Sequence, residues 1–365
     1  MMNRISRWSI AGVLAVTAGT ASSVYAQAPV VVAQGLDNPR GMALGPDGQL
    51  YVVEAGRGGT STLCLANPTG PGQRCYGPSA AVTRITLGMT PTQQRVLTGL
   101  PSVAVPSGAE AAGPSDIAFG FNSAFITVGS GGDPATLTPF RQQNIPFGRL
   151  LMVSLTGQIV PIVDVAAYET TNNPAGGPLD SNIYGLDILA TRGVVVDAGA
   201  NALLQIAADG SVSTLAVFPS RLVPGPGGAS VPMDSVPTTV TEGPDGSLYV
   251  GELTGFPFPV GGARVYRVPA TGGAPTVVAE GFTNIIDIAI GADGSAYVLE
   301  YDANSLLANG SAGRLLKIGP FGFRTELATG MLPSPGGIAI GPDNTIYVST
   351  NSSAAGIGQV VRIRQ

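Results

Sequence analysis

Two sets of oxygen-bearing side chains in this sequence could do chemistry, and both recur at a regular position relative to short apolar runs. The first set lies where a loop turns into an apolar run. Asn and Asp oxygens that converge from several segments are ligands for calcium, which takes about six to eight oxygen atoms. The members of this set are Asn38, Arg40, Asp116, Asn182, Tyr184, Asn284 and Asp287.

We predict a ligand-binding site from this first set, and a bound calcium ion is one form that it can take. The calcium ligands would be Asn38, Asp116, Asn182, Asn284 and Asp287. A purely structural alternative stays open: Asn and Asp at such positions also cap turns or bond backbone groups that have no other partner.

The second set ends apolar runs and consists of Glu54, Asp197, Glu252 and Glu300. Paired carboxylates can transfer protons in catalysis. Recurrence at one position of a repeat instead favours one local structural task, such as accepting N–H bonds at the start of the following loop. Asp197, in "VVVDAGANALLQI", is typical of such a cap.

The remaining composition restricts the chemistry further. The chain has no histidine and a single lysine, Lys317, which excludes Ser-His-Asp and Cys-His nucleophiles and imidazole zinc sites and disfavours Schiff-base chemistry. Catalysis would need carboxylates, tyrosine, backbone dipoles or an oxygen-ligated metal. Acidic residues outnumber basic ones by 23 to 18, so we expect no nucleic-acid partner.

The elements that must position these residues are repeated six times. Each copy holds two β-rich runs around a tight turn, as in "GPDGQLYVVE" and "GPDNTIYVST". Pro-Asp-Gly predicts a type I turn closed by a glycine with positive φ. The copies begin at Arg40, Ser115, Tyr184, Thr238, Ile285 and Gly336.

Further β-rich runs complete the repeats. A third run follows every copy, and a fourth follows five of them; the run "VVVAQGL" from Val30 precedes the first copy and can serve as the fourth strand of the last. We therefore predict an all-β fold: a six-bladed β-propeller over residues 27–365, with four antiparallel strands per blade and the N-terminal strand closing the last blade.

Loop lengths distinguish the two faces of this ring. The turns within the first and second pair of strands are short, whereas the other face carries long segments at 55–79, 129–147, 166–183 and 253–261. Function resides preferentially on long loops of a rigid scaffold, so we expect a small-molecule or protein partner on the long-loop face.

Residues 1–26 have the layout of a secretory signal peptide. Arg4 and Arg7 precede an apolar run, and Val24-Tyr25-Ala26 forms a small-x-small cleavage site. The mature chain is then expected to start at Gln27 and to be secreted or periplasmic. No later segment reaches the roughly 20 apolar residues of a membrane span, so we predict that this protein is not an integral membrane protein.

The two cysteines, Cys64 and Cys75, lie in one polar segment. In an oxidising compartment such a pair is expected to form a disulfide. No neighbouring residue supports the alternatives, a reactive thiol or a metal-binding pair.

Several segments carry a resemblance to known proteins. "VVDAGANALLQI" is similar to an NHL repeat, and "AYETTNNPAGG", "DSNIYGL" and "GELTGFPFPVGGARVYRV" resemble the ScyD/ScyE family of exported bacterial propellers, named from scytonemin pigment clusters. The resemblance covers essentially the whole mature chain, and its most specific segment is "ELTGFPFPVGGARVYRV". It implies a six-bladed propeller outside the cytoplasm and transfers no catalytic residue.

From these observations we expect a binding or scaffold propeller without an identified ligand. The alternative is a calcium-dependent hydrolase of the lactonase or gluconolactonase type, an analogy that rests on fold alone. Asn38, Asp116, Asn182, Asn284 and Asp287 could imitate its axial calcium site, although the first crossover lacks the glutamate of that family.

Overall fold

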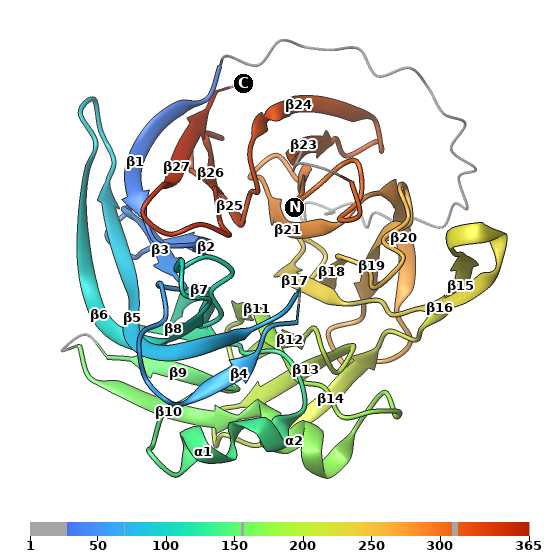
Figure 1. Cartoon of the computed structure of the whole chain (residues 1–365). Coiled ribbons are helices and arrows are strands. Elements are labelled where there is room, and N and C mark those ends of the chain that lie inside the picture. The colour runs from blue at the N-terminus through green and yellow to red at the C-terminus, as the bar shows by residue number, and fades with distance from the viewer. Residues whose placement is uncertain (1–27, 69, 155–156, 309–312, 365) are drawn as a thin grey trace, which may run out of the picture.

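The computed structural model describes residues 28–68, 70–154, 157–308 and 313–364. These residues form six antiparallel sheets arranged as blades around a central axis (Figure 1), which confirms the predicted six-bladed β-propeller. The predicted signal peptide lies outside the described residues, and no helix among the described residues is long and apolar enough to cross a membrane.

The blades share one plan, in which the first strand lies beside the axis and each following strand lies farther out (Figure 1). Blades 1 to 3 consist of β2 (Pro39–Leu44), β3 (Leu50–Glu54), β5 (Gln73–Thr86) and β6 (Thr92–Ala104); β7 (Pro114–Gly120), β8 (Ser123–Val128), β9 (Arg149–Val153) and β10 (Ile159–Asp164); and β11 (Ile183–Ile188), β12 (Arg192–Asp197), β13 (Ala202–Ala207) and β14 (Val212–Val217).

Blades 4 to 6 repeat this plan, and β1 supplies the fourth strand of blade 6. They consist of β17 (Pro237–Glu242), β18 (Leu248–Glu252), β19 (Ala263–Val268) and β20 (Thr276–Phe282); β21 (Ile285–Ile290), β22 (Ala296–Glu300), β23 (Gly313–Ile318) and β24 (Arg324–Leu332); and β25 (Gly337–Ile340), β26 (Ile346–Thr350), β27 (Gly358–Ile363) and β1 (Val30–Leu36).

Ring closure occurs as predicted. β1 pairs antiparallel with β27, with Val31 opposite Val361 and Leu36 opposite Gly358. The inner strands of the first and last blades also approach closely, because a Cβ atom on Gly337 would lie 2.7 Å from the Cα atom of Gly41. The two ends of the described chain are therefore joined through one blade.

The tight turns also form as the Pro-Asp-Gly pattern predicts. In blade 1 the Asp47 carboxylate accepts the N–H of Gln49 at 3.1 Å, and Gly48 adopts φ 71°. The equivalent positions in blades 4 and 5 have φ 73° and 75°, and blade 6 places Asn344 there at φ 59°. These turns join first and second strands on the short-turn face.

The core lies between adjacent blades. Val53 and Leu100 of blade 1 pack with Ile117, Ile126 and Leu151 of blade 2, and all five side chains are buried. Similar clusters of buried aliphatic residues link the other neighbouring blades. Because each apolar face is covered by the next blade, every sheet holds a fixed orientation toward the axis.

The long-loop face carries elements that the repeat pattern does not indicate. β4 (Cys64–Ala66) adds to the extended β5, and the predicted Cys64–Cys75 disulfide is confirmed there. The hairpin β15 (Arg221–Pro224) and β16 (Ser230–Met233) follows blade 3. Three short helices are inserted as well: η1 (Pro134–Leu137), α1 (Thr138–Arg141) and α2 (Val165–Asn172); a further short 3-10 turn, η2 (Pro226–Gly228), lies within the hairpin.

Candidate functional site

The axial strands bring together two of the predicted carboxylates, Asp116 and Asp287. Asp116 lies in β7, where Oδ1 accepts the N–H of Ile117 at 2.8 Å and Oδ2 accepts that of Leu186, in the next blade, at 2.9 Å. Asp287 lies in β21 and accepts the N–H of Ile338, also in the next blade, at 2.9 Å. Each carboxylate therefore ties two adjacent blades together.

Asp187 has the same task but was not among the predicted residues. It lies in β11, and its Oδ2 accepts the N–H of Glu242 in blade 4 at 2.9 Å. The signal available in the sequence was a carboxylate inside an otherwise apolar inner strand, "IYGLDI". Its offset from the strand start differs from that of Asp116 and Asp287, which is why a search at one repeat position omits it.

Burial raises the pKa of both axial carboxyl groups. The pKa of Asp287 is raised to about 6, and the negative charge of Asp287 adds to the effect of burial in raising the pKa of Asp116 well above its ordinary value. The two groups are thus close enough to sense each other. Such a pair favours holding a proton near neutral pH.

Arg40 and Tyr184 lie beside these carboxylates. A guanidinium nitrogen of Arg40 lies 3.5 Å from the Tyr184 hydroxyl, and another donates to the Ala111 carbonyl at 3.0 Å. Burial raises the pKa of Tyr184; the Arg40 charge lowers it, and the charges of Asp287 and Asp116 raise it. The structure therefore gathers four of the seven predicted residues into one axial cluster: Arg40, Asp116, Tyr184 and Asp287.

The three predicted asparagines serve the crossovers. Asn38 is fully buried at φ 51°, and its amide nitrogen donates to the carbonyls of Gly56 and Gly108 at 2.7 and 2.8 Å. Asn284 is fully buried at φ 47° and donates to Leu253 at 2.8 Å. Asn182 is half-buried, and its N–H donates to Asp197 at 2.7 Å.

A calcium site at the axis stays a prediction. Within the part of the chain that the structure describes, no three Cys, Asp or Glu side chains converge closely enough to hold a metal ion. Asp116 and Asp287 could still supply carboxylate oxygens, but both already accept backbone N–H bonds.

The second predicted set occupies one equivalent position in four blades. Glu54, Asp197, Glu252 and Glu300 end the second strand, each opposite the first residue of the inner strand. All four carboxylates are fully buried. Their structural task is confirmed. The partner that recurs in all four blades precedes the inner strand, and Asp197 also accepts an N–H from the following loop, that of Ala200, as the sequence predicts.

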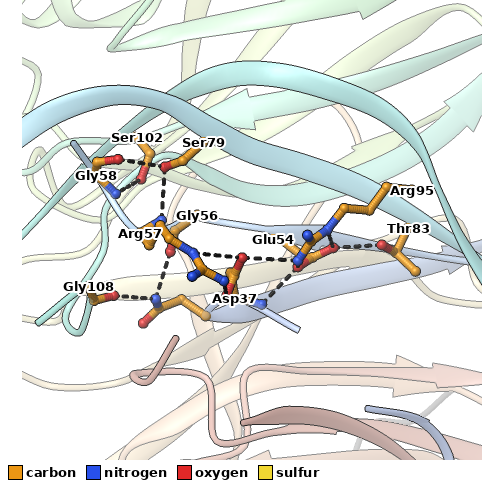
Figure 2. A network of polar contacts seen from close by, with 11 residues as sticks. Asp37, Glu54, Gly56, Arg57, Gly58, Ser79, Thr83, Arg95, Ser102 and Gly108 are labelled. Atoms are coloured by element: carbon orange, nitrogen blue, oxygen red, sulfur yellow. Dashed lines mark hydrogen bonds and ion pairs between the residues drawn. The ribbon is translucent and has the colours of Figure 1, made fainter. Parts of the chain in front are cut away.

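Blade 1 shows this arrangement in full (Figure 2). Glu54 accepts the N–H of Asp37 at 2.7 Å, the Thr83 hydroxyl at 2.6 Å and the Arg95 guanidinium at 2.6 Å. Arg57 pairs in turn with Asp37. A buried carboxylate is thereby neutralised by an arginine and fixes the crossover to the blade.

Blades 4 and 5 also pair the carboxylate with an arginine. Glu252 accepts the Ser235 hydroxyl at 2.6 Å and binds Arg221. Glu300 accepts the N–H of Thr283 at 2.8 Å and binds Arg314 at 2.6 Å.

Blade 3 differs. Asp197 accepts the Ser181 hydroxyl and the N–H of Asn182, both at 2.7 Å, and the N–H of Ala200 at 3.2 Å. Among the described residues no arginine or lysine binds it. Burial raises the pKa of Asp197 to about 6.

A separate cavity of about 670 Å³ lies at the outer edge between blades 3 and 4. Leu215, Arg221, Arg264, Tyr266 and Pro275 are among its lining residues. Arg221 and Tyr266 are already bound to Glu252. None of the predicted site residues lines this cavity.

Of the comparisons with known proteins, only that with solved structures found matches, and these support the fold. No family model matches the chain, and no curated protein matches it. Among solved structures, regucalcin, a calcium-binding protein from Agrobacterium tumefaciens, is 14% identical with a TM-score of 0.50, over 94% of this chain and 96% of that one.

Two further structures are similar. A protein of unknown function from Bacteroides thetaiotaomicron is 9% identical with a TM-score of 0.53, over 94% of this chain and 74% of that one. A streptogramin B lyase is 15% identical with a TM-score of 0.49, over 93% and 97%. At these identities the structures with TM-scores of 0.50 and 0.53 support the fold alone, and function must be argued from the site.

Proposed function

We propose that this protein is an exported binding or scaffold propeller that takes a small molecule or a protein on its long-loop face. The observation that carries the proposal is a contrast between the axis and the loops. The axial carboxylates are already bonded to neighbouring blades, whereas the loops of blades 4 to 6 expose apolar side chains. These are Phe256, Val260, Leu307 and Ile357, each more than half exposed.

The loops that present these side chains are braced from below. The Glu252–Arg221 and Glu300–Arg314 pairs hold the bases of the loops in blades 4 and 5. The Phe256 and Phe258 rings pack edge to face with centroids 6.4 Å apart. A pre-ordered apolar surface loses little conformational entropy on binding, and aromatic side chains contribute strongly to interfaces.

Site-specific photo-crosslinking tests this proposal. A photoreactive phenylalanine analogue at Val260 should give discrete adducts in cells that export the protein, and mass spectrometry reads them whether the partner is large or small. Phe321, in a turn on the short-turn face, is the matched control because it is more exposed than Val260, 79% against 66%. Equal adducts at both positions, or adducts at Phe321 alone, would refute a binding role for the long-loop face.

A calcium-dependent hydrolase is the competing proposal, favoured by the axial cluster. Two carboxyl groups with raised pKa values beside Tyr184 and Arg40 have the chemistry for acid–base catalysis on a lactone or similar ester. Lactone hydrolysis that requires calcium, and is lost in Asp116→Asn and Asp287→Asn but kept in Asp187→Asn, would support it. If the wild-type protein and all three variants lack lactone hydrolysis in the presence of calcium, the hydrolase proposal is eliminated.

Export and family membership are also proposals. The disulfide supports residence in an oxidising compartment, which suits a chain with a secretory signal at residues 1–26. Membership of the ScyD/ScyE family rests on the segments quoted from the sequence. N-terminal sequencing of exported protein should begin at Gln27 if the signal peptide is removed as predicted.

A further inference from the structure

The exception in blade 3 coincides with an unusual buried carboxyl group, Glu169 of α2. Its side chain is 2% exposed, and its Oε2 atom has no hydrogen-bond partner. Its carboxyl group accepts the N–H of Asp180 and senses the negative charge of Asp197. A buried charged oxygen without a partner is costly, so this atom requires a proton or a cation.

The surroundings of Glu169 are acidic. Asp197 is fully buried, Asp180 is exposed, and Asp180 in turn senses the negative charges of Asp234 and Asp133. No arginine or lysine among the described residues binds Glu169, Asp180 or Asp197. The cluster therefore concentrates negative charge on one part of the long-loop face.

The other blades show what is missing. In blade 5 Arg314 lies directly opposite Glu300 across the strand pair, and in blade 3 that position holds Ala202 opposite Asp197. The third and fourth strands of blade 3, "ALLQIA" and "VSTLAV", contain no arginine. The arginines of blades 1, 4 and 5 come from different elements, β6, β15 and β23, whereas in blade 3 no described arginine binds Asp197 and the carboxyl group of Glu169 senses its charge.

We propose that blade 3 binds a calcium ion at Glu169 and Asp180, which replaces the internal arginine of the equivalent blades. Glu169 Oε2 is the buried ligand, and Asp180, whose negative charge Glu169 senses, supplies the exposed carboxylate. Asp197, whose negative charge Glu169 senses, contributes charge but no ligand, because its oxygens already accept three hydrogen bonds. This site is distinct from the axial cluster and does not depend on the proposed binding function.

The chemistry selects calcium over other ions. The cluster offers only oxygen atoms, which are the ligands of calcium and magnesium, and calcium tolerates the irregular geometry of loop carboxylates and water. Two protein carboxylates are few ligands for a calcium ion, and no three acidic side chains among the described residues converge on one point. We therefore expect an affinity of about 10⁻⁴–10⁻³ M, typical of extracellular modules.

Thermal unfolding with and without calcium tests the site. For wild-type protein at pH 8, about 10 mM calcium should raise Tm by roughly 2–4 °C over the value in chelator, as expected for a ligand in about tenfold excess over Kd. Glu169→Gln should abolish this rise, and Asp180→Asn should reduce it. Glu280→Gln, on the edge of blade 4, and Asp287→Asn, at the axis, should retain it.

A second measurement protects the test against unfolded variants. Calorimetric titration of the folded proteins at 25 °C should show calcium binding to wild type and Asp287→Asn but not to Glu169→Gln. Loss of binding in Asp287→Asn with retention in Glu169→Gln would transfer the ion to the axis and overturn the proposal. No calcium response in wild type at pH 8 would also overturn it and would leave a proton as the partner of Glu169.

Discussion

Blades 1 and 3 build the same buried carboxylate position in two different ways. In blade 1, Glu54 is bound by Arg95, and a second arginine, Arg57, extends the network to Asp37. In blade 3, Asp197 has only hydroxyl and N–H donors and a second buried carboxyl group, Glu169, nearby. The buried carboxylate of blade 1 is therefore neutralised by an arginine, whereas that of blade 3 has no cationic side chain bound to it among the described residues.

The difference teaches where to look for function in a repeated fold. A carboxylate paired with an arginine recurs in three blades, as Glu54–Arg95, Glu252–Arg221 and Glu300–Arg314. Its structural role, holding the crossover to the blade, is sufficient to account for it. Blade 3 has the carboxylate without the arginine and therefore does not follow this pattern. Departure from the repeat is therefore more informative than the repeat itself.

Removing an internal arginine is the strongest way to break the comparison. Arg314→Ala should leave Glu300 buried without its cation and lower the free energy of unfolding by about 3–5 kcal/mol. Chemical denaturation measures the loss. The double variant with Glu300→Gln should recover much of it, because the uncompensated charge is then absent; equal losses in the single and double variants would contradict this explanation.

The disulfide is the second constraint of blade 1 and has no counterpart in blade 3, since the chain has only two cysteines. Replacing both Cys64 and Cys75 with Ser should lower the free energy of unfolding by about 3 kcal/mol, because the oxidised unfolded chain carries a closed loop. Denaturation of the oxidised protein and the variant gives the value. An unchanged midpoint would mean that the β4–β5 pairing alone fixes this loop.

Stability in blade 3 should depend on pH in the absence of calcium. Burial raises the pKa of Glu169 to about 7 and that of Asp197 to about 6, so the folded state holds protons that the unfolded state has released. The stabilisation is complete below about pH 4 and is lost as pH rises to about 7, by about 1.4 kcal/mol for each unit by which a pKa is raised, which amounts to several kcal/mol for the two groups. Unfolding curves between pH 5 and 8, in chelator, should show this loss. Glu169→Gln should reduce this loss without abolishing it, because Asp197 and the axial Asp287, with pKa values raised to about 6, still titrate in this range. A loss of equal size in that variant would exclude Glu169 as a titrating group.

An exposed ion pair provides the smallest expected effect. Arg267 and Asp245 lie 2.8 Å apart near the short-turn face, with 42% and 40% of their side chains exposed. Arg267→Ala should change the free energy of unfolding by about 0.5 kcal/mol or less. A loss comparable to that of Arg314→Ala would show that burial does not govern these pairs.

The sequence predicts the ring well because each step is local. Alternating β-rich runs, the Pro-Asp-Gly turns and the run from Val30 determine the strands, the hairpins and the closure that the structure confirms. The disulfide follows from a pair of cysteines in one segment. These features depend on residues that are close in the chain or repeat at a fixed spacing.

The candidate sites depend on longer-range relations and were predicted only in part. Arg40, Asp116, Tyr184 and Asp287 come together because equivalent strands meet at the axis. Glu169 lies on a helix inserted between blades, and no repeat position marks it. Its significance appears only when Asp197 is found without the arginine that binds Glu54, Glu252 and Glu300.

The central claim, that blade 3 takes an external cation where its equivalents use their own, is tested most directly by supplying that cation from the chain. Glu169→Lys places an ammonium group near Asp197, and Glu169→Gln is the matched neutral control. In calcium-free buffer at pH 8, we predict a higher Tm for Glu169→Lys than for Glu169→Gln, with no further rise on adding calcium. A Tm below that of Glu169→Gln, or a calcium response equal to that of wild type, would contradict the claim.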